Sequence, residues 1–274
     1  MNQEGCPILI RNSFLQQSCE QSCQVTAVGP EGEARQENVS VACEHLISVY
    51  INEKPAMELV CSPELLSELV LGRLLTEGII SGSQDVETLY ICEQGARCRV
   101  FLRPSAASLV PAAETVPSCC TGNRLFLRPA EQTLSNREPY RWRPEWITAL
   151  AQVFAGGTPV HNSTHGTHSC ILAKEGIPLY CCEDLGRHNA LDKAVGCALR
   201  NGVDLGKTIL YTSGRVPVDM MQKVIRAGVP VIVSNAVPTD QAVSLAQQYG
   251  VTLICRARPR SFLVFSGADR MDKS

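Results

Sequence analysis

Two adjacent cysteines, Cys119 and Cys120, stand in a stretch of small and turn-forming residues that begins at Pro117 and ends at Gly122. Reactive sulfur chemistry requires a thiol that is exposed, mobile and able to become a thiolate. A thiol buried in a sheet meets none of these conditions, whereas a loop thiol flanked by Ser, Thr and Gly can meet all three. The two cysteines are therefore the first candidates for a nucleophile. A vicinal disulfide between them is a strained alternative.

A second group combines imidazoles and thiols, and its members are His161, His165, His168, Cys170, Cys181 and Cys182. Imidazole and thiolate are the usual zinc ligands. Zinc deaminases place His-x-Glu on one helix and Pro-Cys-x-x-Cys on a later one. Here residues 168–170 read His-Ser-Cys and lack the Glu, and the later helix start at 213–215 lacks both cysteines. We therefore expect no metal site, and a zinc hydrolase or deaminase is the weakest hypothesis.

A Cys-His dyad is another possibility for the loop thiols. Cys119 or Cys120 could meet His168 or His188 only through tertiary structure. The adjacent cysteines at 181–182 end an apolar strand, where successive side chains point to opposite faces. We expect one of that pair in the core and the other under the helix layer, with no catalytic role for either.

The elements that must position these groups are clearest in the C-terminal half. Apolar periodicity predicts strands at 169–173, 179–183, 208–212, 229–234, 252–255 and 262–265. Helices are predicted at 145–154, 188–201, 218–227 and 239–249. Strands that alternate with helices favour βαβ units and a largely parallel sheet. Ligands of such sheets bind beyond the carboxyl ends of the strands.

Polar loops follow three of these strands, at residues 183–189, 212–215 and 234–239. Helix N-termini with a nearby Gly and Arg form an anion pocket. Each loop alone could be an ordinary cap or turn, but three loops at one edge favour a phosphate-bearing ligand. Residues 256–260 contain three further arginines. They could form a solvated turn between two strands, but we favour a clamp that binds phosphate groups.

The N-terminal half predicts two or three strands within 24–50, and further strands at 86–92 and 99–102. Between them, Ser62 and Pro63 predict an N-cap and first turn, and Gly78 ends that helix. Residues 103–145 are rich in Pro, Ala, Ser, Thr and Arg, and read as an interdomain segment that contains the cysteine pair.

Composition limits the class of protein. The chain has 274 residues, 45% hydrophobic and 19% charged, with a net charge of −2. These values predict a folded protein of one large or two smaller domains, without bulk binding to nucleic acid or acidic membranes. The sequence shows neither a signal peptide nor an apolar stretch of about 20 residues. We therefore expect a cytoplasmic protein whose 14 cysteines stay reduced and are mostly buried.

The segment at 183–193, Glu-Asp-Leu-Gly-Arg-His-Asn-Ala-Leu-Asp-Lys, resembles the signature of the FdhD/NarQ family of formate dehydrogenase accessory sulfurtransferases. Three further segments fit in the same order. Residues 71–80 resemble the N-terminal helix and turn of the family, 164–168 its Thr-Gly-Gly-x-His segment, and 212–215 a later loop. The resemblance extends from about residue 40 to 265.

The resemblance implies an α/β fold in which a cytidine-deaminase-like domain without zinc chemistry covers 145–274. A smaller α+β domain would cover 1–115, and 116–144 would be a mobile cysteine loop, expected to be partly disordered without ligand. Family members are similar to homodimeric sulfur carriers. They take persulfide sulfur from a cysteine desulfurase and sulfurate the bis(molybdopterin guanine dinucleotide) molybdenum cofactor, bound as substrate, for formate dehydrogenase. A guanine nucleotide could mimic that cofactor.

Carried onto this chain, the resemblance makes Cys120, with Cys119 as the alternative, the persulfide-forming thiol of a sulfurtransferase. The expected cofactor-binding residues are His168, Asp184, Arg187, His188, Asn189, Ser213, Gly214, Arg215, Ser234, Cys255, Arg256, Ala257, Arg258, Pro259 and Arg260. Many family members carry Cys-x-x-Cys in the loop, whereas this chain has adjacent cysteines. That departure leaves a second hypothesis open, a non-catalytic chaperone of the molybdenum cofactor.

Overall fold

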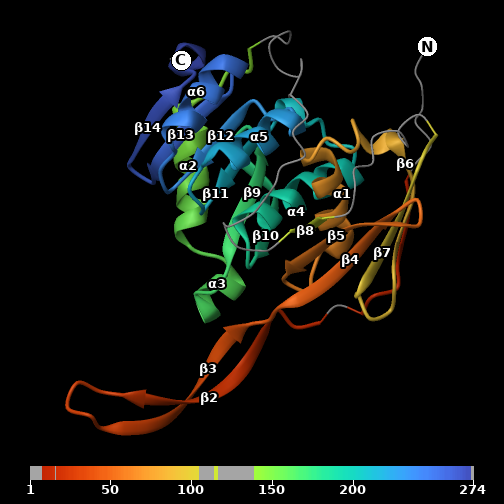
Figure 1. Ribbon diagram of the computed structural model, residues 1–274. Helices are drawn as coiled ribbons and strands as arrows, with labels where there is room; N and C mark the ends of the chain where they lie inside the picture. The colour runs from red at the N-terminus through yellow and green to blue at the C-terminus, as the bar shows by residue number, and fades with distance from the viewer. Residues whose placement is uncertain (1–7, 16, 105–113, 117–138, 273–274) are drawn as a thin grey trace.

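The computed structural model describes residues 8–15, 17–104, 114–116 and 139–272 (Figure 1). Within this part of the chain, two six-stranded sheets and a separate two-stranded ribbon combine with six α-helices, as expected for the α/β class. No helix in these ranges is long and apolar enough to cross a membrane.

The first sheet belongs to the N-terminal half and has the strand order β1-β6-β7-β4-β5-β8. Its strands are β1 (Leu9–Asn12), β4 (His45–Ile51), β5 (Lys54–Cys61), β6 (Val86–Ile91), β7 (Arg97–Leu102) and β8 (Glu114–Val116). A tight turn joins β4 to β5, and both of its residues, Asn52 and Glu53, have positive φ, at 48° and 65°. Such turns match the twist of a hairpin, so β4 and β5 pair antiparallel.

The second sheet carries the candidate site and has the order β10-β9-β11-β12-β13-β14. Its strands are β9 (His168–Lys174), β10 (Ile177–Asp184), β11 (Ile209–Thr212), β12 (Val231–Ser234), β13 (Thr252–Arg258) and β14 (Ser261–Ser266). Helices α5 (Val218–Ala227) and α6 (Asp240–Tyr249) connect β11, β12 and β13, which run parallel.

The prediction of a largely parallel sheet is wrong, because three of its five strand pairings are antiparallel. The turn at Glu175 and Gly176 is too short for a crossover and makes β9–β10 a hairpin, and the turn at 259–260 does the same for β13–β14. Parallel neighbours need a connection of a dozen residues or more. The sheet is therefore mixed.

Helices cover both faces of the second sheet. One face packs against α2 (Pro144–Ala155), whose Ile147 and Leu150 lie in a cluster with Ile171 and Val233. The opposite face packs against α4 (Arg187–Arg200) and α5, and this core continues without a break into the first sheet. Helices α1, α4 and α5 thus lie between the two sheets (Figure 1).

Helix α1 (Leu66–Thr76) crosses α4 at two glycines, one on each helix, and each glycine faces the backbone of the opposite helix. A Cβ atom added at Gly72 would lie 1.8 Å from the carbonyl oxygen of Asp192. A Cβ atom added at Gly196 would lie 1.9 Å from that of Glu68. Any larger residue at either position would separate the helices, so this contact between the two halves of the chain requires glycine.

The start of α1 differs from the sequence prediction. The helix begins at Leu66, after Leu65 with a φ of 51°, and not at Pro63. The backbone N–H of Ser62, predicted as the N-cap, instead donates to Asp184 Oδ2 at 3.0 Å. The Oγ atom of Ser62, which would have to cap the helix, has no hydrogen-bond partner among the described residues, so the predicted N-cap is wrong. The predicted end is confirmed, because Gly78 follows the helix with a φ of 74°.

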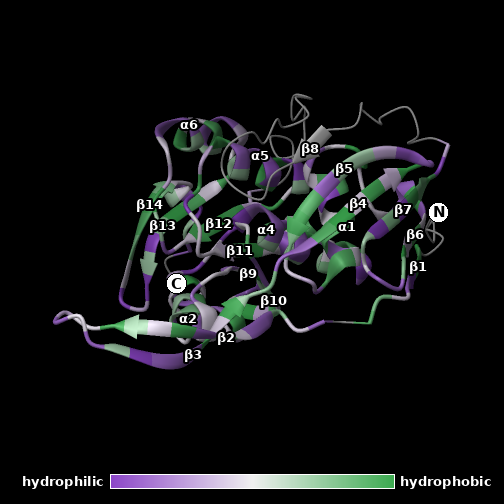
Figure 2. Ribbon diagram, turned by 60° about the horizontal axis from the view of Figure 1, so that its bottom comes forward, coloured by the Kyte–Doolittle hydropathy of each residue, from purple (hydrophilic) through white to green (hydrophobic). Residues whose placement is uncertain are grey.

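A two-stranded ribbon of β2 (Glu20–Val28) and β3 (Ala34–Ala42) projects from the body near the six-residue helix α3 (Pro159–Thr164) (Figure 1). One face carries Cys23, Val25 and Val39, and the other face is mostly polar, which gives the alternation of colour in Figure 2. With β4, these strands confirm the predicted strands of the 24–50 region.

Candidate functional site

The predicted polar loops meet at one edge of the second sheet. Strand β9 runs antiparallel to β10 and β11, so its first residue, His168, lies opposite Asp184, the last residue of β10. The next strand, β11, ends at Thr212 opposite Cys170. The final residues of β11 and β12, Thr212 and Ser234, also pair. Starts and ends of neighbouring strands therefore bring distant loops together.

Hydrogen bonds fix these loops to one another. Ser213 Oγ accepts from the backbone N–H of Ser169 at 3.0 Å and lies 3.1 Å from His168 Nδ1. Buried Ser234 donates from Oγ to the carbonyl of Gly214 at 2.7 Å. A Cβ atom at Gly214 would lie 2.8 Å from the side chain of Arg187, so only glycine lets that arginine cross here.

A cavity of about 420 Å³ opens beside this edge, between α2, α3 and the ends of β11 and β13. One wall is aromatic, because the rings of Phe154 and Tyr211 stack with centroids 4.6 Å apart. Tyr211 is held by its hydroxyl, which donates to the carbonyl of Ala257 at 3.1 Å. Of the predicted binding residues, the cavity is lined by Ser213, Ala257, Arg258 and Pro259.

Sequence reasoning named His161 and His165 only as possible metal ligands and missed other lining residues, namely Phe154, Thr158, Asn162, Ser169, Tyr211 and Asn235. Several come from α3, a short helix that the periodicity analysis did not predict. Thr158 followed by Pro159 was a usable signal, because Pro is common in the first turn of a helix.

The buried carboxylate of Glu183 organises the α3 side of the cavity. It accepts from the hydroxyls of Thr158 and Thr167 at 2.5 and 3.1 Å. It also accepts from the backbone N–H groups of Val160 and His161 at 3.1 and 2.8 Å. These two N–H groups lie in the first turn of the helix and have no partner within it. Glu183 thereby fixes both the helix and two residues that line the cavity.

The tautomer of His161 follows from its partner. Its Nδ1 lies 2.7 Å from the carbonyl oxygen of Thr167, which can only accept a hydrogen bond. Nδ1 therefore carries the proton, and in the neutral ring Nε2 is an acceptor. The ring of His165 lies edge-on at a centroid distance of 5.7 Å. The cavity thus contains a histidine with a defined hydrogen-bonding role.

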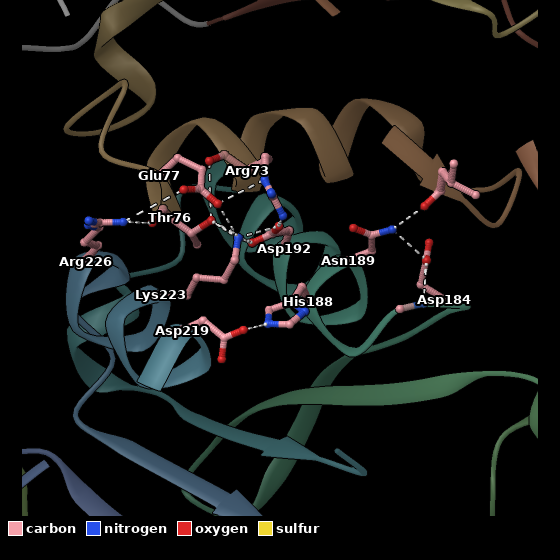
Figure 3. A network of polar contacts seen from close by, with 12 residues as sticks. Arg73, Thr76, Glu77, Asp184, His188, Asn189, Asp192, Asp219, Lys223 and Arg226 are labelled. Carbon is pink, nitrogen blue, oxygen red and sulfur yellow. Dashed lines mark hydrogen bonds and ion pairs between the residues drawn. The ribbon is translucent and has the colours of Figure 1, made fainter. Parts of the chain in front are cut away.

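The two predicted site histidines favour the neutral form. Burial and the nearby charge of Arg187 lower the pKa of His168. Burial also lowers the pKa of His188, although its Nε2 lies 2.7 Å from Asp219 Oδ2, an interaction that opposes the shift (Figure 3). Burial alone would raise the pKa of Asp219, but the contact with His188 outweighs it and the pKa is lowered. Neither histidine lines the cavity.

Two predicted binding residues, Asp184 and Asn189, have buried partners within the protein. The fully buried carboxylate of Asp184 accepts from Ser62 N–H and from Asn189 Nδ2, and its Oδ2 lies 2.8 Å from Lys193 Nζ. The amide of Asn189 also donates to the carbonyl of Val60 at 2.8 Å. Together they join the start of α4 to the segment after β5.

A second part of the same signature segment enters a buried ionic network between α1, α4 and α5 (Figure 3). Asp192 accepts from Thr76 Oγ1 at 2.7 Å and lies 2.8 Å from Lys223 Nζ and 3.3 Å from Arg73 Nη1. Glu77 lies 3.1 Å from both cations. Burial would raise the pKa of Glu77, but Lys223 and Arg73 outweigh it and the pKa is lowered.

The predicted arginine clamp lies around a second cavity of about 510 Å³, which shares Asn235 and Arg258 with the first. Arg258 Nη1 donates to the carbonyl of Asn235 at 2.8 Å. Arg256 lines this second cavity, whereas Arg215 and Arg260 are exposed and line neither. Cys255 is fully buried on the helix side, and burial raises its pKa to about 12.

The predicted nucleophiles Cys119 and Cys120 lie outside the described residues, and so does any dyad they form with a histidine. Within the described ranges, no group of three or more His, Cys, Asp and Glu side chains could hold a metal ion. Cys182 is in the core, but Cys181 is exposed, so the prediction that it lies under the helices is wrong. It lies on β10, an edge strand with a neighbour on one side.

Comparison with known proteins decides the family. The sequence profile of the FdhD/NarQ family matches residues 42–272. The chain belongs to the FdhD/NarQ family. It is 30% identical over 239 residues to the sulfur carrier protein FdhD of Listeria monocytogenes, covering 85% of this chain and 91% of that one. It is 32% identical over 256 residues to the FdhD of an Anaeromyxobacter species, covering 85% and 88%.

The fold is shared with a solved structure assigned as a formate dehydrogenase accessory protein from Desulfotalea psychrophila. The TM-score is 0.78 at 25% sequence identity, over 93% of this chain and 100% of that one. The family match covers residues 42–272, and the signature segment at 183–193 forms the end of β10 and the start of α4, with the buried contacts of Asp184 and Asp192.

Proposed function

We propose that this FdhD/NarQ protein is a sulfur carrier for formate dehydrogenase maturation. It would take sulfur from the persulfide of a cysteine desulfurase and pass it to the bis(molybdopterin guanine dinucleotide) molybdenum cofactor, its substrate. Relatives named sulfur carrier proteins, and a structural neighbour assigned as a formate dehydrogenase accessory protein, support the general role. A homodimer and a cytoplasmic location stay predictions.

The observation that carries the proposal is the pair of adjoining cavities at the sheet edge. The first has a stacked aromatic wall and hydrogen-bonding groups, among them His161 and Ser169. The second is bordered by Arg256 and shares Arg258 with the first. A planar heterocycle suits the aromatic wall, and phosphates suit the guanidinium groups. A guanine nucleotide combines both features, as does each half of the proposed cofactor.

The loop thiols would perform the first transfer. The thiolate of Cys120, or of Cys119, attacks the terminal sulfur of the donor persulfide. The sulfur–sulfur bond of the donor breaks, and its cysteine leaves as a thiolate. The sulfane sulfur is then held as a persulfide on this chain until it is passed to the bound cofactor. Covalent catalysis of this kind divides one transfer into two.

Intact-mass measurement after incubation with a cysteine desulfurase and cysteine tests this function. We expect the mass to increase by one sulfur atom and the increase to be reversed by reductant. One of the two variants Cys120→Ala and Cys119→Ala should abolish the increase, and that variant identifies the carrier thiol. Cys23→Ala is the control, because it removes a partly exposed thiol on the projecting ribbon. A sulfur gain that survives loss of both loop thiols contradicts the carrier assignment. No gain in any form, with guanosine diphosphate still bound, supports the cofactor chaperone instead.

A further inference from the structure

A second pair of thiols lies away from the loop and from both cavities. Cys182 is near the end of β10 and Cys197 is in the third turn of α4, and their Sγ atoms are 4.0 Å apart. The two side chains are 1% and 6% exposed, so they are closed to a protein sulfur donor, and any reagent that reaches them must be a small molecule. Neither lines a cavity, and the proposed sulfur transfer uses neither.

The surroundings make the two thiols unequal. The hydrogen bond with Cys182 lowers the pKa of Cys197, against the effect of burial, and the positive charges of Arg200 and Lys193 act in the same direction. The same hydrogen bond and burial raise the pKa of Cys182. Either sulfur can donate the S–H at this distance, and the lowered pKa makes Cys197 the thiol that more readily forms the thiolate. A thiolate, not a thiol, is the nucleophile in thiol oxidation.

We propose that Cys182 and Cys197 are a peroxide-reactive dithiol site that closes to a disulfide between β10 and α4. The sulfur atoms must approach from 4.0 Å to a bond length of about 2 Å. Only the short turn at Leu185 and Gly186 separates the two elements in sequence, so the closed loop is small. Side-chain rotation and a slight movement of α4 bring the two atoms together.

The chemistry balances with hydrogen peroxide as the oxidant. The Cys197 thiolate attacks one peroxide oxygen, the oxygen–oxygen bond breaks, and hydroxide leaves and takes up a proton to become water. The Cys182 sulfur then attacks the resulting sulfenic acid. The sulfur–oxygen bond breaks, and the hydroxyl leaves as a second water with the proton of Cys182. Two thiols lose two electrons, and one peroxide becomes two waters.

Closure would act on the candidate site through α4. The first residues of this helix are Arg187 and His188, and Arg187 contacts Gly214 at the sheet edge. A disulfide from Cys197 to Cys182 would fix the helix against the strand that ends in Glu183 and Asp184. The dithiol thus couples peroxide exposure to the position of the helix that starts at the site.

Peroxide treatment of the native full-length protein, followed by alkylation under denaturing conditions and peptide mapping, tests the proposal. We expect a peptide pair linked through Cys182 and Cys197, with the mass of two hydrogens lost and full reversal by dithiothreitol. Cys197→Ala should abolish the link and leave Cys182 reduced. Cys98→Ala, which removes a fully buried thiol elsewhere, should leave the link unchanged.

Three results would overturn the proposal. The first is full alkylation of both thiols under conditions that oxidise exposed Cys181. The second is a link from Cys182 to its cross-strand neighbour Cys170 in place of Cys197. The third is oxidation of Cys197 to a sulfinic acid without any link. Circular dichroism before and after treatment ensures that the link forms in folded protein.

Discussion

Replacing Asp192 with Asn should destabilise the protein severely, because it removes one of the two carboxylates that face three buried cations, Arg73, Lys223 and Arg226. Lys223 and Asp192 are completely buried, and Arg73 and Glu77 nearly so. At an effective dielectric constant of about 20, unit charges 2.8 Å apart attract by about 6 kcal/mol. Asn keeps the shape and one hydrogen-bond acceptor, but among the described residues it leaves Glu77 as the one carboxylate of this network that faces the three cations.

The expected loss is about 3–5 kcal/mol of the free energy of unfolding, which is the usual effect of breaking a buried ion pair. Urea unfolding followed by far-UV circular dichroism should show the midpoint falling by about 1–2 M. Glu53→Gln is the control, because Glu53 forms an ion pair with Arg99 in which both side chains are about half exposed. Its effect should stay below about 1 kcal/mol.

A double variant separates the charge imbalance from a simple packing defect. Asp192→Asn combined with Lys223→Met removes one charge of each sign and leaves Arg73 paired with Glu77. The double variant should therefore be more stable than Asp192→Asn alone. The reasoning is refuted if Asp192→Asn unfolds within about 1 kcal/mol of the wild type, or if the two substitutions simply add.

Two further predictions concern the histidines. His161→Asn keeps a donor for the Thr167 carbonyl but removes the Nε2 acceptor, so calorimetry should show guanosine diphosphate binding about five- to tenfold more weakly, as loss of one hydrogen bond predicts. The control His45→Asn changes a histidine that lines neither cavity and should bind like the wild type. An unaffected His161 variant contradicts the assigned role. The pKa values of His168 and His188 are lowered in the folded protein, so near their ordinary pKa the unfolded chain binds more protons than the folded one. The free energy of unfolding should therefore be highest above about pH 6.5 and should fall as the pH drops below it. The urea midpoint should fall as the pH is lowered from about 7.5 to 5.5, and it should fall less steeply in His188→Gln. A midpoint that does not change with pH would contradict the prediction.

The sequence determined the family, the class of fold and the order of most elements, because these depend on local patterns. Apolar periodicity placed α4, α5 and α6 within a few residues of their observed bounds, and Gly78 marked the end of α1. The polar loops after the strands were also predicted to meet at one edge of the sheet, and strand pairing brings them together there. These signals come from neighbouring residues, so a single sequence contains them.

Only the tertiary structure decided what the signature residues do. Asp184 and Asp192 read as polar residues beside a loop and a helix, yet their partners Ser62 and Thr76 lie more than 100 positions away in the chain. The same holds for the segment before α1, where the Ser62 N–H binds distant Asp184 and the helix begins at Leu66, not at the Ser-Pro signal. A buried charge is stable only with partners that satisfy it, and the fold alone brings such partners together.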